Sequence, residues 1–202
     1  MRLTLLFVLF LASAASADLF LDDFADGEQG WQGWQPVVVG GGGAGGPDDP
    51  YLLVTSNSNG SGPGSRLAVY NEQSRWTGVG PLFVADVLYG EDTTLEMRLV
   101  LIAGDGTRWT STNAAPVTAN DDWQTIALDP LDMTRVAGTA SLDETLATLS
   151  RTLLRHDAGA PSSGGTPIAT GVGLDNLGYV VVPEPSTLLP ALAAGLLLAR
   201  RR

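Results

Sequence analysis

The chain has no cysteine, no lysine and a single histidine, His156, among its 202 residues. Without cysteine there is no disulfide scaffold, no thiolate nucleophile and no cysteine-ligated zinc. One histidine leaves little basis for histidine-rich metal sites or for serine–histidine–aspartate chemistry. These absences favour a binding or structural protein over an enzyme, and we expect no catalytic residues.

Positive charge is also scarce. The 11 basic residues are all arginine and face 22 acidic residues, which gives a net charge of −11. Residues 18–182, which exclude the two end segments described below, hold seven arginines and 21 acidic side chains, a net charge of −14. Binding to nucleic-acid phosphates needs clustered cations, so we expect no nucleic-acid partner. A stretch of this length is enough for one domain with a full core.

Residues 1–17 have the layout of a secretory signal peptide. Arg2 precedes an apolar run over residues 3–12, and the segment closes on Ser-Ala-Ala-Ser-Ala, which ends at Ala17. A positive start, a short apolar stretch and small residues at the exit are typical of a cleaved export signal. The alternative is a buried first helix. We expect export and cleavage after Ala17.

The C-terminal segment, residues 183–202, has three parts in order. Pro183, Glu184 and Pro185 precede an apolar run over residues 188–199, and Arg200, Arg201 and Arg202 end the chain. The run is shorter than the ~18–20 residues that span a bilayer comfortably. Arginines at its end would hold that end on the cytoplasmic side. The layout predicts a hydrophobic stop-transfer helix at a membrane, with the folded domain outside.

These residues resemble the PEP-CTERM sorting signal of Gram-negative bacteria, which joins a Pro-Glu-Pro tripeptide, a hydrophobic stretch and terminal arginines. The resemblance implies processing near Pro183–Pro185 by a membrane exosortase after transient anchoring in the inner membrane. It also implies release to the cell surface or to an exopolysaccharide-rich extracellular matrix. An ordinary C-terminal membrane anchor is the alternative.

Between these ends, short runs of β-branched and aromatic residues alternate with Gly, Pro, Asn and Asp clusters, the pattern of an all-β domain. An Asp-Gly turn at Asp105 and Gly106 predicts a hairpin. The glycine-rich segment 40–46 contains G-x-G-x-x-G, but Pro47 follows it instead of a helix, so we read it as a loop. The expected strands cover residues 18–24, 34–39, 51–55, 66–70, 81–89, 95–103, 107–111, 123–128 and 174–182.

One segment departs from this strand pattern and has helical periodicity. Ser141 and Glu144 form a capping-box pattern, and the leucines at 142, 146, 149 and 153 then recur at helical spacing. The pattern predicts a helix over 142–155, with His156 capping its C-terminal end. The fold class that follows is all-β: an antiparallel, jelly-roll-like sandwich over residues 18–182 with one short helix, flanked by the signal-peptide helix and the C-terminal hydrophobic helix.

The order of landmarks in 18–182 resembles exported jelly rolls typified by laminin domain IV and calcium-binding carbohydrate-binding modules. The landmarks are the segments at 24–31, 46–52, 76–78, 122–124 and 173–177, together with the leucine-rich helix. No defined sugar-contact motif matches, so the resemblance implies the fold and leaves the ligand open. In such jelly rolls the first and last strands lie close together and a structural calcium commonly joins them.

The acidic residues near the two ends of the domain are therefore calcium candidates. Asp23, Asp26 and Glu28 lie near the start of the domain, and Asp175 lies on the last expected strand. Calcium takes six to eight oxygen ligands, which carboxylates and carbonyls supply. The alternative is that these acids are solvated and that Asp175 with Asn176 caps a turn. Apart from this calcium ion we expect no cofactor.

Tryptophan supplies the other candidate site, because sugars stack on exposed aromatic rings. Trp31 and Trp34 are the candidates for facing a ligand, although their odd spacing puts them on opposite faces of a single strand. Large aromatics in a sandwich are more often core residues.

The function favoured by the sequence is that of an exported, non-catalytic envelope or matrix protein whose sandwich binds a glycan or another surface component. Two alternatives stay open: a glycan-active enzyme with paired carboxylates, and a purely structural adhesive module.

Overall fold

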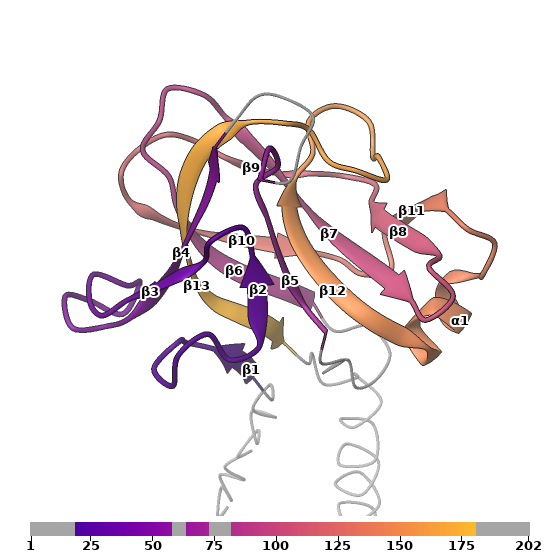
Figure 1. Ribbon diagram of the computed structural model, residues 1–202, viewed down its shortest axis with the longest axis horizontal. Coiled ribbons are helices and arrows are strands. Elements are labelled where there is room, and N and C mark those ends of the chain that lie inside the picture. The colour runs from indigo at the N-terminus through magenta and orange to yellow at the C-terminus, as the bar shows by residue number, and fades with distance from the viewer. Residues whose placement is uncertain (1–18, 58–63, 73–81, 181–202) are drawn as a thin grey trace, which may run out of the picture.

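The computed structural model describes residues 19–57, 64–72 and 82–180, which form two antiparallel β-sheets packed against each other (Figure 1). The signal segment 1–17, the tail 183–202 and Trp76 lie outside the described residues. No helix in the described part of the chain is long and apolar enough to cross a bilayer. The predicted antiparallel jelly-roll-like sandwich is confirmed.

The first sheet holds the first and last strands of the described chain. Its order is β10-β6-β13-β4-β3, and β1 pairs with β13. Because Leu19 lies opposite Val180, the two ends of the described chain leave the domain side by side. This neighbourhood is the one expected from the jelly-roll resemblance. The strands are β1 (Leu19–Asp22), β3 (Val37–Val39), β4 (Tyr51–Asn57), β6 (Leu82–Leu88), β10 (Trp123–Leu128) and β13 (Ala169–Val180).

The second sheet has the order β11-β8-β7-β12-β5-β2, with β9 paired to β7. Neighbouring strands β5, β12, β7 and β8 run side by side in Figure 1. The predicted Asp-Gly hairpin joins β7 to β8, and Asp105 accepts a hydrogen bond from the Thr107 amide at 2.8 Å. The strands are β2 (Trp31–Gly33), β5 (Ala68–Asn71), β7 (Leu95–Ala103), β8 (Arg108–Ser111), β9 (Ala115–Val117), β11 (Met133–Ala137) and β12 (Leu149–His156).

The core fills the space between the sheets. Along β4 and β6 every second side chain is buried, as half-buried strands require. Leu52 and Val54 of β4 belong to the same buried cluster as Leu99 of β7 and Leu154 of β12. Burial of these side chains is the main favourable term in folding, at about 25 cal/mol per Å² of apolar surface.

The predicted helix over 142–155 is wrong in its second half. The helix α1 (Leu142–Ala147) begins at the predicted capping box, in which Ser141 and Glu144 bond each other's backbone amides. The chain then enters β12, which lies between β7 and β5. A strand in that place gains hydrogen bonds on both sides and buries Leu154, which outweighs local helix propensity.

His156 consequently lies on a strand and does not cap a helix. Its side chain is buried, and its Nδ1 accepts a hydrogen bond from the Glu96 amide at 3.1 Å. Burial lowers the pKa of His156 below its ordinary value. The histidine is therefore part of the packed interior at the edge of β7.

Arg98 on β7 fastens a long loop, residues 157–166, to the second sheet. The side chain is 3% exposed. Its guanidinium donates to the carbonyls of Asp157 at 2.9 Å, Ser111 at 2.6 Å and Thr112 at 2.8 Å, and also to the carbonyl of Gly159. These bonds satisfy the backbone of the loop and of the β8 end at the same time.

We therefore predict that Arg98→Met destabilises the protein by about 2–4 kcal/mol, because the carbonyls of buried Ser111 and Asp157 lose a charged donor. Urea unfolding measures the change. Arg135→Met is the matched control, since Arg135 is exposed and donates to the Thr139 carbonyl at 2.9 Å. Its loss should cost less than about 1 kcal/mol. Equal destabilisation by both variants would contradict this role for Arg98.

Candidate functional site

Three strands of the second sheet place a row of side chains on its outer face. Arg151 of β12 lies opposite Ile102 of β7, and Ile102 lies opposite Arg108 of β8. Glu72 directly follows β5 and forms an ion pair with Arg151; the two side chains are 49% and 40% exposed. The row thus carries two guanidinium groups and one carboxylate, all accessible to solvent.

Tyr70 lies in the adjacent row on the same face. It lies opposite Leu153 of β12 on one side and Gln32 of β2 on the other. Its hydroxyl donates to the Gln32 side-chain carbonyl at 3.0 Å, and the Arg151 guanidinium carbon lies 4.5 Å from the ring centroid. The half-buried ring is held by its hydroxyl at one end and by the guanidinium over one of its faces, so its orientation is fixed before any ligand arrives.

A shallow, open depression of about 490 Å³ lies along this row. Its lining includes Glu72, Ile102, Gly104, Arg108, Ser150 and Arg151. Half of the lining residues are charged or carry a hydroxyl, which gives a hydroxyl-rich ligand hydrogen-bonding partners beside Ile102 and small residues. Together with Tyr70, the depression offers hydrogen-bonding groups next to an aromatic ring.

The loop 157–166 forms a wall of this face. Buried Arg155 donates to Asp157 Oδ2 at 3.0 Å, and Asp157 also accepts from the Ser162 amide at 3.0 Å. Arg108 donates to the carbonyl of Ser163 at 2.9 Å. The wall is therefore tied to β8 and β12 by guanidinium groups.

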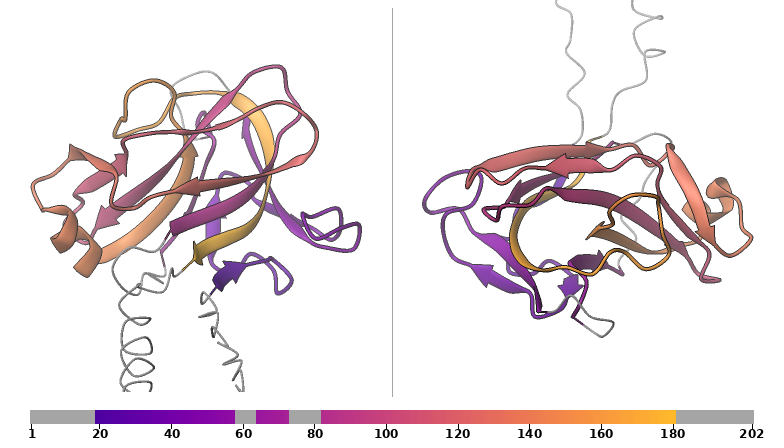
Figure 2. Two further views of the ribbon diagram at one scale, coloured as in Figure 1. Left: turned by 180° about the vertical axis from the view of Figure 1, so that it is seen from behind. Right: turned by 90° about the horizontal axis from the view of Figure 1, so that it is seen from above.

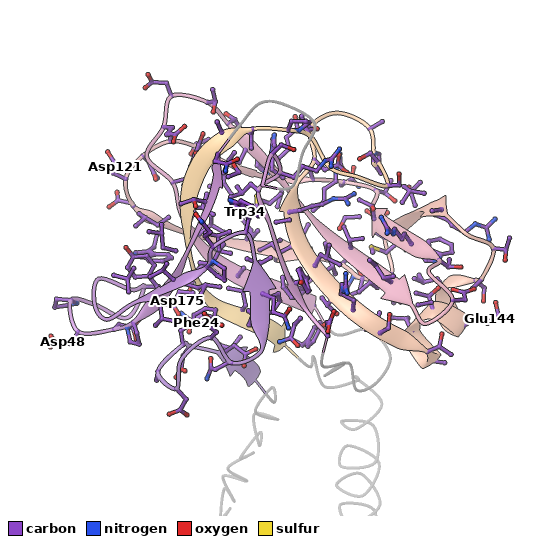
Figure 3. The ribbon with its side chains drawn as sticks, viewed as in Figure 1. Phe24, Trp34, Asp48, Asp121, Glu144 and Asp175 are labelled. Carbon is purple, nitrogen blue, oxygen red and sulfur yellow. The ribbon has the colours of Figure 1, made fainter. Side chains whose placement is uncertain are left out.

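Asp175, the calcium candidate on the last strand, lies beneath the glycine-rich loop. Its Oδ2 accepts from the Ala44 amide at 2.8 Å and its Oδ1 from the Asn176 amide at 2.7 Å. Figure 3 shows Asp175 close to the sheet and Asp48 at the outer tip of the loop. Burial raises the pKa of Asp175 to about 6, with the neighbouring Asp49 carboxyl contributing to the rise and the Ala44 and Asn176 amides opposing it.

The other three calcium candidates are placed differently. Asp23, Asp26 and Glu28 are exposed in the turn after β1, where Asp23 accepts from the Ala25 amide at 3.1 Å. Within the described ranges no three acidic or histidine side chains gather as a metal-binding group. The predicted set of four is therefore not assembled, because Asp175 turns toward the glycine loop and its acidic neighbour is Asp49.

The outer face of the first sheet has aromatic side chains of its own. Tyr51 and Trp123 meet edge to face, 5.4 Å between ring centroids, and the Trp123 indole donates to the Gly42 carbonyl at 3.1 Å. Gly173 lies under both rings, since a Cβ there would come within 3.1 Å of each. These rings hold the glycine loop, which lies at the end of the molecule away from α1 (Figure 2).

The two candidate tryptophans are not equally available to a ligand. Trp31 is 3% exposed, and its indole donates to Asp22 Oδ2 at 2.8 Å, so Trp31 is a core residue and the ligand-facing prediction for it is wrong. Trp34 is half-buried against Gly64, whose Cβ position would lie 2.6 Å from the ring. The sorting residues Pro183, Glu184 and Pro185 and the arginines 200–202 lie outside the described residues.

Sequence reasoning did not find Gln32, Tyr70, Glu72, Arg108 or Arg151. A signal was present in residues 149–156, where outward Arg151, Leu153 and Arg155 alternate with inward side chains. The leucine spacing fits a helix as well, and the helical interpretation hid this alternation. The pairing of β12 with β5 and β7 is what brings these residues together.

No family model and no curated protein matches the chain in sequence. Its fold, however, is similar to that of solved carbohydrate-binding modules. A family 11 module from Clostridium thermocellum, in complex with a β-1,3-1,4-mixed-linked tetrasaccharide, is similar at a TM-score of 0.55 and 14% identity, covering 83% of this chain and 97% of that one.

Two family 22 modules are similar in fold to about the same degree. The C-terminal module of Clostridium thermocellum Xyn10B, studied for ligand binding in its cleft, has a TM-score of 0.52 at 14% identity, with 84% of this chain and 97% of that one covered. The xylan-binding CBM22-2 domain of Paenibacillus barcinonensis Xyn10C has a TM-score of 0.53 at 14% identity, with 82% and 100% covered. The described chain thus has the jelly-roll sandwich found in these carbohydrate-binding modules.

Proposed function

We propose that this protein is an exported, non-catalytic glycan-binding module that holds a polysaccharide chain against the outer face of its second sheet. The observation that carries the proposal is the fixed Tyr70 ring beside the open depression between Glu72, Arg151 and Arg108. The fold similarity supports it, because the similar modules are named for binding a mixed-linked tetrasaccharide and xylan.

The chemistry of this face suits sugar rings. A pyranose presents an apolar C–H face that stacks on an aromatic ring, and equatorial hydroxyls that point sideways. Tyr70 offers the ring, and Gln32, Glu72 and Arg151 surround it with donors and acceptors. Because these groups already bond one another, little side-chain order is lost on binding.

The end segments support export and sorting. We propose that residues 1–17 direct secretion, and that residues 183–202 anchor the protein in the inner membrane until an exosortase-type enzyme processes the tail. The protein would then reach the cell surface or an exopolysaccharide matrix of a Gram-negative bacterium. Within the described chain, β1 and β13 pair with each other in the first sheet, which is the sheet opposite the proposed glycan-binding face.

A structural calcium ion at Asp175 remains part of the proposal. Asp49 and Asp175 both lie at the Gly43 backbone, since a Cβ there would come within 2.6 Å of one carboxylate and 2.9 Å of the other. Two facing carboxylates repel when both are ionised, and a divalent cation removes that repulsion. Asp49 and Asp175 would hold the ion, and backbone carbonyls and water would complete its shell.

Tyr70→Ala should weaken binding of a mixed-linked β-glucan or xylan oligosaccharide by about tenfold, the equivalent of ~1.4 kcal/mol, because the stacking surface is lost. Titration calorimetry measures the affinity. Tyr51→Ala on the first sheet is the matched control and should leave the affinity within about twofold.

Loss of binding in Tyr51→Ala, with none in Tyr70→Ala, would move the site to the first sheet. Release of reducing ends from polysaccharide by the wild type would overturn the non-catalytic part of the proposal and favour a glycan-active enzyme. Absence of binding to every glycan would favour the structural adhesive module.

The Asp175 site predicts a linked response to calcium and pH. A carboxyl whose pKa is raised from 3.8 to about 6 stabilises the fold when protonated, and this contribution is lost as pH rises from about 4 to 6. In chelator, wild type should therefore lose stability over that interval relative to Asp175→Asn. At pH 7, calcium at a hundredfold excess over its dissociation constant should restore ~2.7 kcal/mol to wild type alone. Equal melting temperatures in chelator and in millimolar calcium would exclude the ion.

The tail layout predicts that the mature protein lacks residues 188–202 in a host with an exosortase. Intact-mass measurement on secreted material decides this, with a Glu184→Ala variant as the comparison. A mature mass that includes Arg202 would show that the segment is only an anchor.

A further inference from the structure

The arginines of the described chain gather on one face of a strongly acidic protein. Five of the six lie on or beside the outer face of the second sheet: Arg66, Arg98, Arg108, Arg151 and Arg155. The sixth, Arg135, lies on edge strand β11 with its guanidinium 5.8 Å from the Trp109 ring. Three carboxylates accompany the five: Glu72, Glu96 and Asp157.

The guanidinium groups on this face lie close enough to repel one another. Burial is the main reason that the pKa of Arg155 is lowered, and the charges of Arg108 and Arg66 lower it further, while Asp157 opposes the change. Asp157 is buried and bonded to Arg155 itself. The Asp157 carboxylate is therefore already engaged by Arg155.

The partners of these two arginines are neutral. Arg108 donates to the Ser163 carbonyl at 2.9 Å and Arg66 to the Gly165 carbonyl at 3.2 Å. Among the described residues neither forms an ion pair with a carboxylate. A carbonyl satisfies a hydrogen bond without cancelling the charge, so exposed Arg108 keeps donors and a full positive charge at the edge of the depression.

The depression also contains an ion pair whose guanidinium group an incoming ligand can contact. Arg151 and Glu72 are each about half exposed, so their ion pair is worth little to stability. An incoming carboxylate can share the Arg151 guanidinium, and guanidinium–carboxylate pairs are bidentate and directional. Arg151 and Arg108 are two strands apart, with Ile102 between them.

We propose that the polysaccharide bound by this face is anionic and carries the carboxylates of uronic acid residues, which Arg108 and Arg151 receive in the depression beside Tyr70. This inference rests on the proposed glycan-binding function and adds the class of glycan. A neutral glycan would leave the Arg108 charge uncompensated. The acidic remainder of the surface does not prevent binding, because charges beyond about 8 Å are largely screened at physiological salt.

The test uses two ligands with the same backbone: polygalacturonate and its fully methyl-esterified form, in which a methyl group on each carboxyl removes the charge. The purified full-length protein is titrated with each at about 0.1 M and 0.5 M salt. Arg108→Gln is compared with Arg135→Gln, which removes the same charge outside the face. Circular dichroism confirms that both variants are folded.

Wild type should bind polygalacturonate at least about tenfold more tightly than the ester at low salt, and higher salt should reduce the difference. Arg108→Gln should lose about three- to tenfold for polygalacturonate and nothing for the ester, while Arg135→Gln should match wild type. Equal binding of both ligands, or an equal effect of both variants, would overturn the inference.

Two further outcomes separate this inference from the proposed function. Binding of neutral β-glucan or xylan with Tyr70 required, but no preference for polygalacturonate over its ester, would keep the glycan-binding function and overturn the anionic class. Binding of dextran sulfate as tight as that of polygalacturonate would show attraction to any polyanion and would overturn the uronate assignment.

Discussion

The second sheet depends on the register of one strand, β12. Lying between β7 and β5, it sends Leu154 into the core, where that side chain is fully buried, and sends Arg151, Leu153 and Arg155 to the outer face. A shift of one residue would exchange the two sets, because the side-chain period of a strand is two. Burial of Leu154 therefore determines the register of β12, and that register places Arg151 and Arg155 on the same outer face as Tyr70.

Backbone carbonyls explain how an acidic protein keeps a positive face. Arg98, Arg66 and Arg108 all direct donors at carbonyls, most of them in the loop 157–166. Each bond orders the loop and satisfies its backbone, yet none neutralises a guanidinium. The loop is thus held over the sheet by groups whose charge still acts on the depression. Stability of the wall and attraction for an anionic ligand come from the same side chains.

The sequence predicts well what depends on neighbours along the chain. The bounds expected for β7 and β10 are those observed, and the Asp-Gly turn at Asp105 joins β7 to β8 as expected, because strand-forming runs and turn chemistry are local. The candidate site depends on which strands lie side by side, and no local pattern carries that. The leucine spacing predicted a helix through residues 149–155, but hydrogen bonding to β7 on one side and β5 on the other makes this segment the strand β12. Asp175 was predicted as a calcium ligand from the sequence, but its acidic neighbour Asp49 was not, because Asp49 lies in a loop more than a hundred residues earlier in the chain.

The central claim is that a glycan lies on the outer face of the second sheet. A crystal structure of the protein with a bound oligosaccharide tests it most directly. The account predicts density for a sugar ring stacked on Tyr70, with polar contacts to Arg151 and Arg108 in the depression. Density on the first sheet, against Tyr51 and Trp123 beside the glycine loop, would contradict it.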